Sequence, residues 1–126
     1  MTDTVHVILD ETAMTAAGAG NPLVSRLIHR AHTETGWRLY APACALVEAG
    51  RAHPGTAEHL TALPGLTVLD LDLPAVLAVT QQTDWAHAHT WHTARPTPDR
   101  PDGAIIATTT PKRWKGAPVR VLDLSP

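Results

Sequence analysis

The chain has 126 residues and a mass of 13.5 kDa, which is enough for one folded domain and too little for two. Apolar residues make up 44% of the sequence and charged residues 17%, a composition typical of globular rather than disordered proteins. Ten Lys and Arg against twelve Asp and Glu give a formal net charge of −2. This net charge excludes a positive potential over the whole surface, which indiscriminate binding to nucleic acid would require.

Apolar periodicity and turn residues predict strands that alternate with helices. We expect five strands, at residues 5–9, 37–41, 66–69, 104–108 and 119–122. Residues 12–17 lead into a Gly-rich turn at 18–21, and helices are expected at 22–35, from 42 to Gly50 or Pro54, and at 56–63, 74–82 and 84–94. This alternation predicts an α/β fold with residues 1–126 as one domain. The connection 109–118 is short for a parallel crossover, so the direction of the last strand stays open.

No apolar run approaches the roughly 20 residues that a membrane helix needs. The first ten residues contain neither Lys nor Arg, which fits neither a secretory signal nor a transit peptide. The single cysteine, Cys44, cannot form an internal disulfide, and its apolar neighbours indicate a packed small side chain. We therefore expect a cytoplasmic protein without a membrane segment.

Three acidic residues interrupt apolar surroundings near the predicted ends of strands and starts of helices. Asp10 follows the first strand, Glu48 lies in an otherwise apolar helix, and Asp84 begins a helix rich in Trp, Ala and His. Two carboxylates about 4 Å apart repel by roughly 4 kcal/mol at an effective dielectric of 20, so a cluster of acids needs a proton or a cation. Oxygen ligands favour Mg²⁺ or Mn²⁺, which can activate a water for attack on a phosphodiester. The acids thus predict a metal-dependent nuclease.

Four segments carry a family resemblance, in order and over nearly the whole chain. They are Val-Ile-Leu-Asp-Glu-Thr-Ala-Met at 7–14, Tyr-Ala-Pro-Ala-Cys-Ala-Leu-Val-Glu-Ala-Gly-Arg at 40–51, Thr-Asp-Trp-Ala-His-Ala-His at 83–89, and Ile-Ile-Ala-Thr-Thr-Thr-Pro at 105–111. The chain resembles PIN domains, in particular the small VapC-type ribonucleases of bacterial toxin–antitoxin modules. The resemblance implies a Rossmann-like, mostly parallel sheet of about five strands flanked by helices. It also implies an endoribonuclease toxin that is restrained by an antitoxin protein and forms a homodimer.

The same resemblance assigns the site. Asp10, Glu48 and Asp84 would hold Mg²⁺ or Mn²⁺, and a bound water would attack the RNA backbone. The family's fourth acid is replaced by Thr110, which weakens a second metal position most. Asp102 is a rival for the third acid, but too little chain follows it for the helix that normally comes next. The expected neighbours of the site are Thr12, His87, Thr108 and Thr110.

Each assignment has an alternative. Asp10 and Asp84 could be helix caps, and Glu48 could be an exposed position on an amphipathic helix. Glu11 is expected to face solvent. The replacement at Thr110 supports the alternative that the chain is a catalytically degenerate PIN-like domain, acting as a protein-interaction or RNA-binding module.

Basic and aromatic side chains are candidates for RNA contacts or for packing. The candidates for phosphate contacts near these motifs are Arg51, Lys112, Arg113 and Lys115, with Trp114 as an aromatic platform; a solvated surface loop is the alternative. Trp85 and Trp91 are expected in the core or at a dimer interface.

The histidines of the last long helix raise the question of zinc. His87 and His89 point to nearly opposite sides of a helix and cannot share an ion, whereas His89 and His92 could. Because no third ligand is evident, we expect these histidines to be exposed or to stack on RNA.

Overall fold

Five short apolar segments form one parallel sheet in the computed structural model, which describes residues 4–126. The strands are β1 (Val5–Leu9), β2 (Trp37–Pro42), β3 (Leu66–Leu69), β4 (Ile105–Thr108) and β5 (Val121–Asp123). Their order is β3-β2-β1-β4-β5, and every neighbouring pair is parallel. The expected α/β fold with a five-stranded sheet is confirmed, and the last strand is parallel to the others.

Six α-helices and one 3₁₀ helix connect the strands within residues 4–126. They are α1 (Glu11–Gly18), α2 (Pro22–Thr33), α3 (Ala43–Ala52), α4 (Thr56–Thr61), α5 (Leu73–Val79), α6 (Trp85–Ala94) and the 3₁₀ helix η1 (Pro111–Trp114). Side-chain oxygens cap four of the helices at their amino ends, those of Asp10, Asn21, Asp72 and Asp84. None of these helices is both long and apolar enough to cross a membrane.

The sequence prediction missed α1 and misplaced some boundaries. Residues 12–17 are helical rather than a plain connection, because Asp10 caps the segment and its alanines favour a helix. The predicted helix at 74–82 ends at Val79, since Gln81 and Gln82 continue as turns with three-residue hydrogen bonds. The last strand begins at Val121 rather than 119, and η1 replaces the irregular connection before it.

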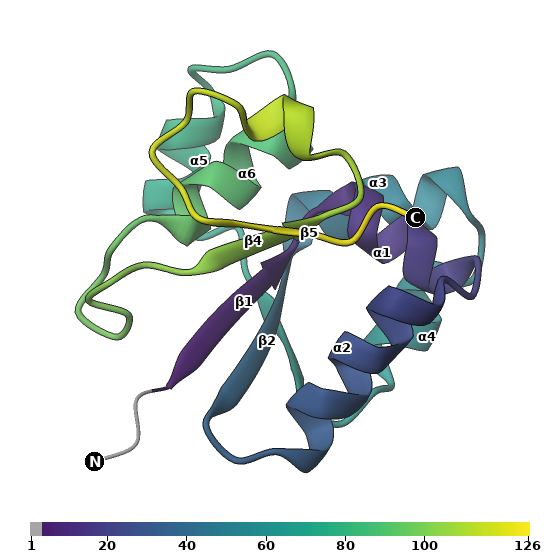
Figure 1. Ribbon diagram of the computed structural model, residues 1–126. Coiled ribbons are helices and arrows are strands. Elements are labelled where there is room, and N and C mark those ends of the chain that lie inside the picture. The colour runs from purple at the N-terminus through teal and green to yellow at the C-terminus, as the bar shows by residue number, and fades with distance from the viewer. Residues whose placement is uncertain (1–3) are drawn as a thin grey trace.

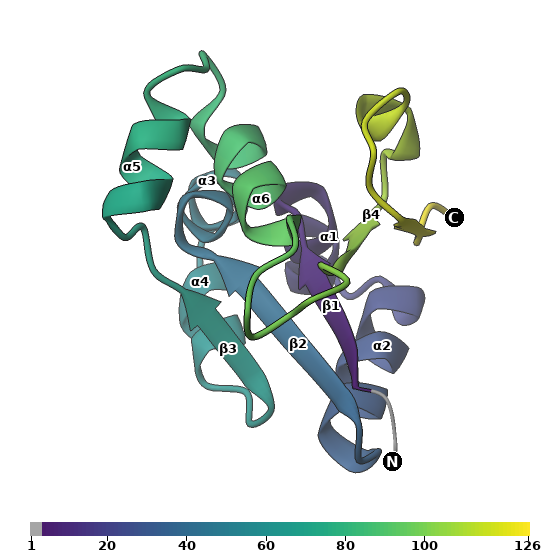
Figure 2. The same ribbon diagram turned by 90° about the vertical axis from the view of Figure 1, so that its left-hand side faces the viewer.

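Helices cover both faces of the sheet (Figure 1). Alternate side chains of a strand point to opposite faces. Val7 and Leu9 of β1 belong to a core shared with α1, α2, α3 and α4, whereas Ile8 packs with Ala94 of α6 and Trp114 of η1. Figure 2 shows α5 and α6 packed side by side, away from α2.

The central strand sits where the chain order reverses. β1 pairs with β2 on one side and with β4 on the other, so its carboxyl end marks the switch point of the sheet. In open parallel sheets, ligand sites lie beyond this point. Asp10 is the first residue after β1, and it is there that the candidate site is found.

Candidate functional site

Asp10 is a fully buried carboxylate, with 0% of its surface exposed. Its Oδ1 accepts hydrogen bonds from the Thr12 hydroxyl at 2.6 Å and from the Ala13 backbone N–H at 3.0 Å. Its Oδ2 accepts one from the indole Nε1 of Trp114 at 3.1 Å and lies 4.0 Å from Nη1 of Arg113. Protein donors thus satisfy both oxygens, which offsets the cost of burying the charge.

Threonine side chains join the start of α1 to the end of β4. The hydroxyls of Thr12 and Thr108 are 3.0 Å apart, and the Thr109 N–H donates to the Thr12 hydroxyl at 3.1 Å. The Thr110 N–H donates to the Thr108 hydroxyl at 3.0 Å, while the Thr110 side chain is exposed. Thr12 thus contacts Asp10 directly, Thr108 is linked to Asp10 through Thr12, and Thr110 contributes its backbone.

Arg113 brings three carboxylates together. Its Nη1 and Nη2 donate to the two carboxylate oxygens of Glu11 at 2.8 and 3.1 Å, a paired geometry. Nη2 also lies 3.8 Å from Oδ2 of Asp84, and Nη1 lies 4.0 Å from Asp10. We call Asp10, Glu11, Asp84 and Arg113 the acidic cluster. The expectation that Glu11 faces solvent was wrong, because its side chain is only 16% exposed and pairs with the guanidinium.

His87 and Trp114 form one wall of the acidic cluster. Their rings stack with centroids 4.1 Å apart and planes 10° apart, and His87 Nδ1 lies 3.2 Å from Nη2 of Arg113. An arginine nitrogen can only donate, so Nδ1 accepts and the ring is neutral. Burial and the Arg113 charge lower the pKa of His87, against the opposite effects of Asp84 and Asp10. Burial raises the pKa of Glu11, although the Arg113 charge lowers it.

The burial of Trp114 differs from the sequence prediction. Trp114 was expected as an exposed aromatic platform, but it is 2% exposed and bonds to Asp10. The signal in the sequence was a single tryptophan in an otherwise charged turn after β4, at Pro-Lys-Arg-Trp. A bulky apolar side chain in such a segment is more often packed than exposed.

Two of the three predicted acids converge, and Glu48 does not join them. Asp84 caps α6 through the His87 N–H, is 61% exposed, and shares Arg113 with Asp10. Glu48 is exposed on α3. Between residues 4 and 126, no group of three or more His, Cys, Asp or Glu side chains is arranged to hold a metal ion.

The residues present do not fit Mg²⁺ or Mn²⁺ in this arrangement. Oδ1 of Asp10 already accepts two hydrogen bonds, and a cation approaching Oδ2 of this fully buried side chain would meet the Arg113 guanidinium 4.0 Å away. A divalent cation also needs oxygen ligands that are open to it and to its waters. The chemistry that the acidic cluster supports is ion pairing and hydrogen bonding.

The other predicted contacts lie around the acidic cluster or away from it. Lys112 and Lys115 flank Arg113 and are exposed, as is Arg51 on α3. Arg113 was a candidate for RNA phosphates, but its guanidinium is engaged by carboxylates.

His89 is buried, so the expectation of an exposed or RNA-stacking histidine was wrong at this position. Its Nδ1 accepts a hydrogen bond from the Cys44 backbone N–H at 3.2 Å, which puts the ring proton on Nε2. A protonated Nε2 cannot bind zinc, and this tautomer therefore argues against a site shared with His92. Burial lowers the pKa of His89.

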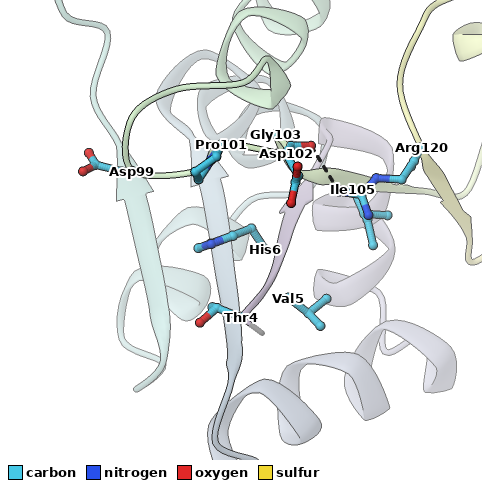
Figure 3. A pocket seen from close by; sticks show the side chains of 9 residues that line it. All are labelled: Thr4, Val5, His6, Asp99, Pro101, Asp102, Gly103, Ile105 and Arg120. Carbon is cyan, nitrogen blue, oxygen red and sulfur yellow. Dashed lines mark hydrogen bonds between the residues drawn. The ribbon is translucent and has the colours of Figure 1, made fainter. Parts of the chain in front are cut away.

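A cavity of about 550 Å³ lies at the opposite end of the sheet, near the amino ends of β1 and β4. Figure 3 shows His6 beneath the loop that carries Asp102, with Arg120 at one side. Arg120 donates to the Asp102 carbonyl at 3.4 Å, and His6 Nδ1 lies 2.8 Å from the Tyr40 hydroxyl. None of the four residues of the acidic cluster lines this cavity.

Comparison with known proteins places the chain in no family. It matches no protein-family model and no curated protein. The assignment of function therefore depends on the geometry of the acidic cluster and of the surface around it.

Proposed function

We propose that this chain is a PIN-like domain that does not cleave RNA and acts as a protein-binding module in the cytoplasm. The observation that carries the proposal is the state of Asp10, whose fully buried carboxylate accepts hydrogen bonds from Thr12, Ala13 and Trp114 and lies beside the Arg113 guanidinium. A nuclease of this kind needs that carboxylate for its metal ion. Here it serves the packing of η1 against β1.

Exposed apolar side chains on α5 and at the start of α6 support protein binding. Leu73 and Leu77 are one helical turn apart and are 69% and 60% exposed, so they share a face of α5. Trp85 begins α6 and is 66% exposed. It therefore does not lie in the core, and of its two expected places, the core or a dimer interface, only the interface remains. Single exposed apolar side chains are ordinary on protein surfaces, whereas several on one face are typical of interaction sites.

The charge pattern favours protein over RNA as the partner. Residues 52–94, which include α5 and α6, contain four acids and no Lys or Arg. RNA affinity depends largely on Lys and Arg contacts to phosphates. In the C-terminal segment Arg113 is already paired with Glu11, whereas Lys112 in η1 and Lys115 just after it are exposed. We propose a second copy of the chain as the first partner to test.

Sedimentation equilibrium tests the binding surface. We expect the wild type to dimerise and the double variant Leu73→Glu/Leu77→Glu to be monomeric. Leu23→Glu is the matched control, since Leu23 is an exposed leucine on α2. A wild type that stays monomeric up to its highest soluble concentration would contradict the homodimer.

Incubation with mixed RNA tests the absence of cleavage. The wild type and Asp10→Asn are compared in Mn²⁺ with and without chelator. We expect no cleavage that depends on both the metal and Asp10. Cleavage that the chelator stops and the substitution removes would overturn the proposal, whereas cleavage insensitive to the substitution indicates a contaminating nuclease.

The second candidate function is a metal-dependent endoribonuclease, the toxin of a toxin–antitoxin module. The observation in its favour is that Asp10 and Asp84, far apart in the sequence, lie against the same guanidinium. Mg²⁺ or Mn²⁺ as cofactor, an RNA substrate and an antitoxin partner belong to this candidate. Thr110→Asp would supply the fourth acid of the family, and metal-dependent cleavage gained by that variant would favour it.

A further inference from the structure

We infer that the guanidinium of Arg113 supplies the positive charge that Asp10, Glu11 and Asp84 would otherwise take from a divalent cation. The inference rests on the proposed loss of metal-dependent cleavage and explains how the acids are retained without a metal ion. Arg113 would then be a permanent internal cation that holds η1 on the carboxyl end of the sheet.

The position of Arg113 is the first step of the argument. The three carboxylates come from the end of β1, the first residue of α1 and the cap of α6, and the guanidinium is within 4.0 Å of each of them. Asp10 is fully buried and the adjacent Glu11 is 16% exposed, whereas Asp84 is 61% exposed. Like charges on two poorly hydrated carboxylates are unfavourable, so a positive charge beside Asp10 and Glu11 is stabilising.

The rigidity of the contact is the second step. Arg113 bonds to both oxygens of Glu11, and its Cζ lies 5.6 Å from the centre of the Trp114 ring. The neighbouring Trp114 is itself fixed by Asp10 and by stacking on His87. A side chain held by a paired hydrogen bond and packed next to a buried ring is preorganised rather than free to leave. A divalent cation would therefore compete with a fixed charge.

Thermal unfolding in the presence of MnCl₂ tests the inference. The wild type, Arg113→Met and Lys112→Met are each heated in Mn²⁺ and in NaCl of equal ionic strength. Lys112→Met removes one positive charge from the same 3₁₀ helix, but Lys112 is exposed, so it controls for net charge. We expect Mn²⁺ to raise the melting temperature of Arg113→Met alone, because only this variant opens the acidic cluster to a cation.

Both opposite results would overturn the inference. One is a wild type that Mn²⁺ stabilises as much as it stabilises Arg113→Met. The other is a folded Arg113→Met that does not respond to Mn²⁺, since the acids then form no cation site even when vacated. If Arg113→Met does not fold, the wild type is titrated with Mn²⁺ and its backbone amide NMR signals are followed instead. Selective broadening of the Ala13 and His87 signals contradicts the inference, and its absence supports it.

The outcome is separable from that of the proposed function. If the wild type binds Mn²⁺ but does not cleave RNA, the inference about Arg113 is wrong and the proposed non-catalytic binding module still stands. If RNA cleavage depends on Asp10, the proposed function is wrong. The two assays therefore fail independently.

Discussion

The indole Nε1 of Trp114 donates a hydrogen bond of 3.1 Å to Oδ2 of Asp10, across 104 residues of sequence. The bond joins the end of the central strand to the C-terminal segment, and both residues are buried. A buried carboxylate with a neutral donor of this kind has a structural role that can be measured by mutation. The acidic cluster is thus part of what stabilises the fold.

Trp114→Phe should separate this hydrogen bond from the packing of the ring. The phenyl group can still stack on His87 but cannot donate to Asp10, so we expect a loss of about 1–3 kcal/mol in the free energy of unfolding. Trp114→Ala also leaves a cavity and should cost about 3–5 kcal/mol. Urea unfolding measures both. The exposed Trp85→Phe should change stability by less than about 0.5 kcal/mol, and an equal loss there would refute the role of the hydrogen bond.

Asp10→Asn tests whether the carboxylate is compensated. Asparagine can still accept from Thr12 and Ala13, but its NH₂ group then faces the Trp114 N–H, and the attraction to Arg113 is lost. We expect a destabilisation of about 1–3 kcal/mol in urea unfolding. An uncompensated acidic site would respond in the opposite way, because removal of a repelling charge stabilises the fold. A more stable Asp10→Asn would therefore contradict our description of the site.

Stability should fall as the pH drops below about 6.5, the ordinary pKa of histidine. Burial is the main cause that lowers the pKa values of His6, His87 and His89 in the folded state. The unfolded chain then binds more protons than the folded one, so their contribution is complete above pH 6.5 and is lost as the pH falls through the folded pKa values. The raised pKa of Glu11 has the opposite effect, because this group stabilises the folded state as the pH falls. It is one group against three histidines, so the fall in stability should remain.

Urea unfolding at several pH values checks this dependence. His89→Asn should make it shallower, because the amide oxygen can accept from the Cys44 N–H and does not titrate. The exposed His59→Asn is the control and should leave the dependence unchanged. A wild type equally stable at pH 7 and pH 5 would show that these histidines do not couple to folding.

Gly103→Ala should be strongly destabilising. Gly103 has φ +73°, and an added Cβ would lie 2.5 Å from the Ala94 carbonyl oxygen, where the chain turns from the end of α6 into β4. We expect a cost of about 2–4 kcal/mol from the strained backbone and the clash. Gly20→Ala is the matched control, since its φ is +84° with no atom within 4 Å of the added Cβ; it should cost about 1–2 kcal/mol. Equal costs would contradict the close approach.

Most of the fold could be predicted from the sequence, because buried parallel strands have a local signal. The run Val5–Leu9 and the run Ile105–Thr108 are apolar, β-branched and bounded by turn residues. The helix α1 was missed because its Ala and Thr residues show little apolar periodicity. Its start depends on the Asp10 cap, and an acid directly after a buried strand suits a metal ligand as well as a helix cap.

The candidate site was less predictable, because its key contacts join residues that are distant in sequence. The position of Asp84 against Arg113 depends on how α6 and η1 pack over the sheet. Spacing alone could not indicate that Arg113 pairs with Glu11 or that Trp114 is buried. The basic residues after β4 could contact either RNA phosphates or carboxylates of the same chain. Only the tertiary structure shows that Arg113 contacts carboxylates.

The place of β1 has a consequence for the order in which the protein folds. It comes before the other strands of residues 4–126, yet it lies in the middle of the sheet and pairs with β4 at Val7 and Ile105. Asp10 likewise accepts a hydrogen bond from Trp114, 104 residues away. Such distant pairing slows folding, since long loops must close before contacts form. Until β4 pairs with β1, a partly folded molecule exposes an unpaired strand edge, and such an edge is prone to aggregation.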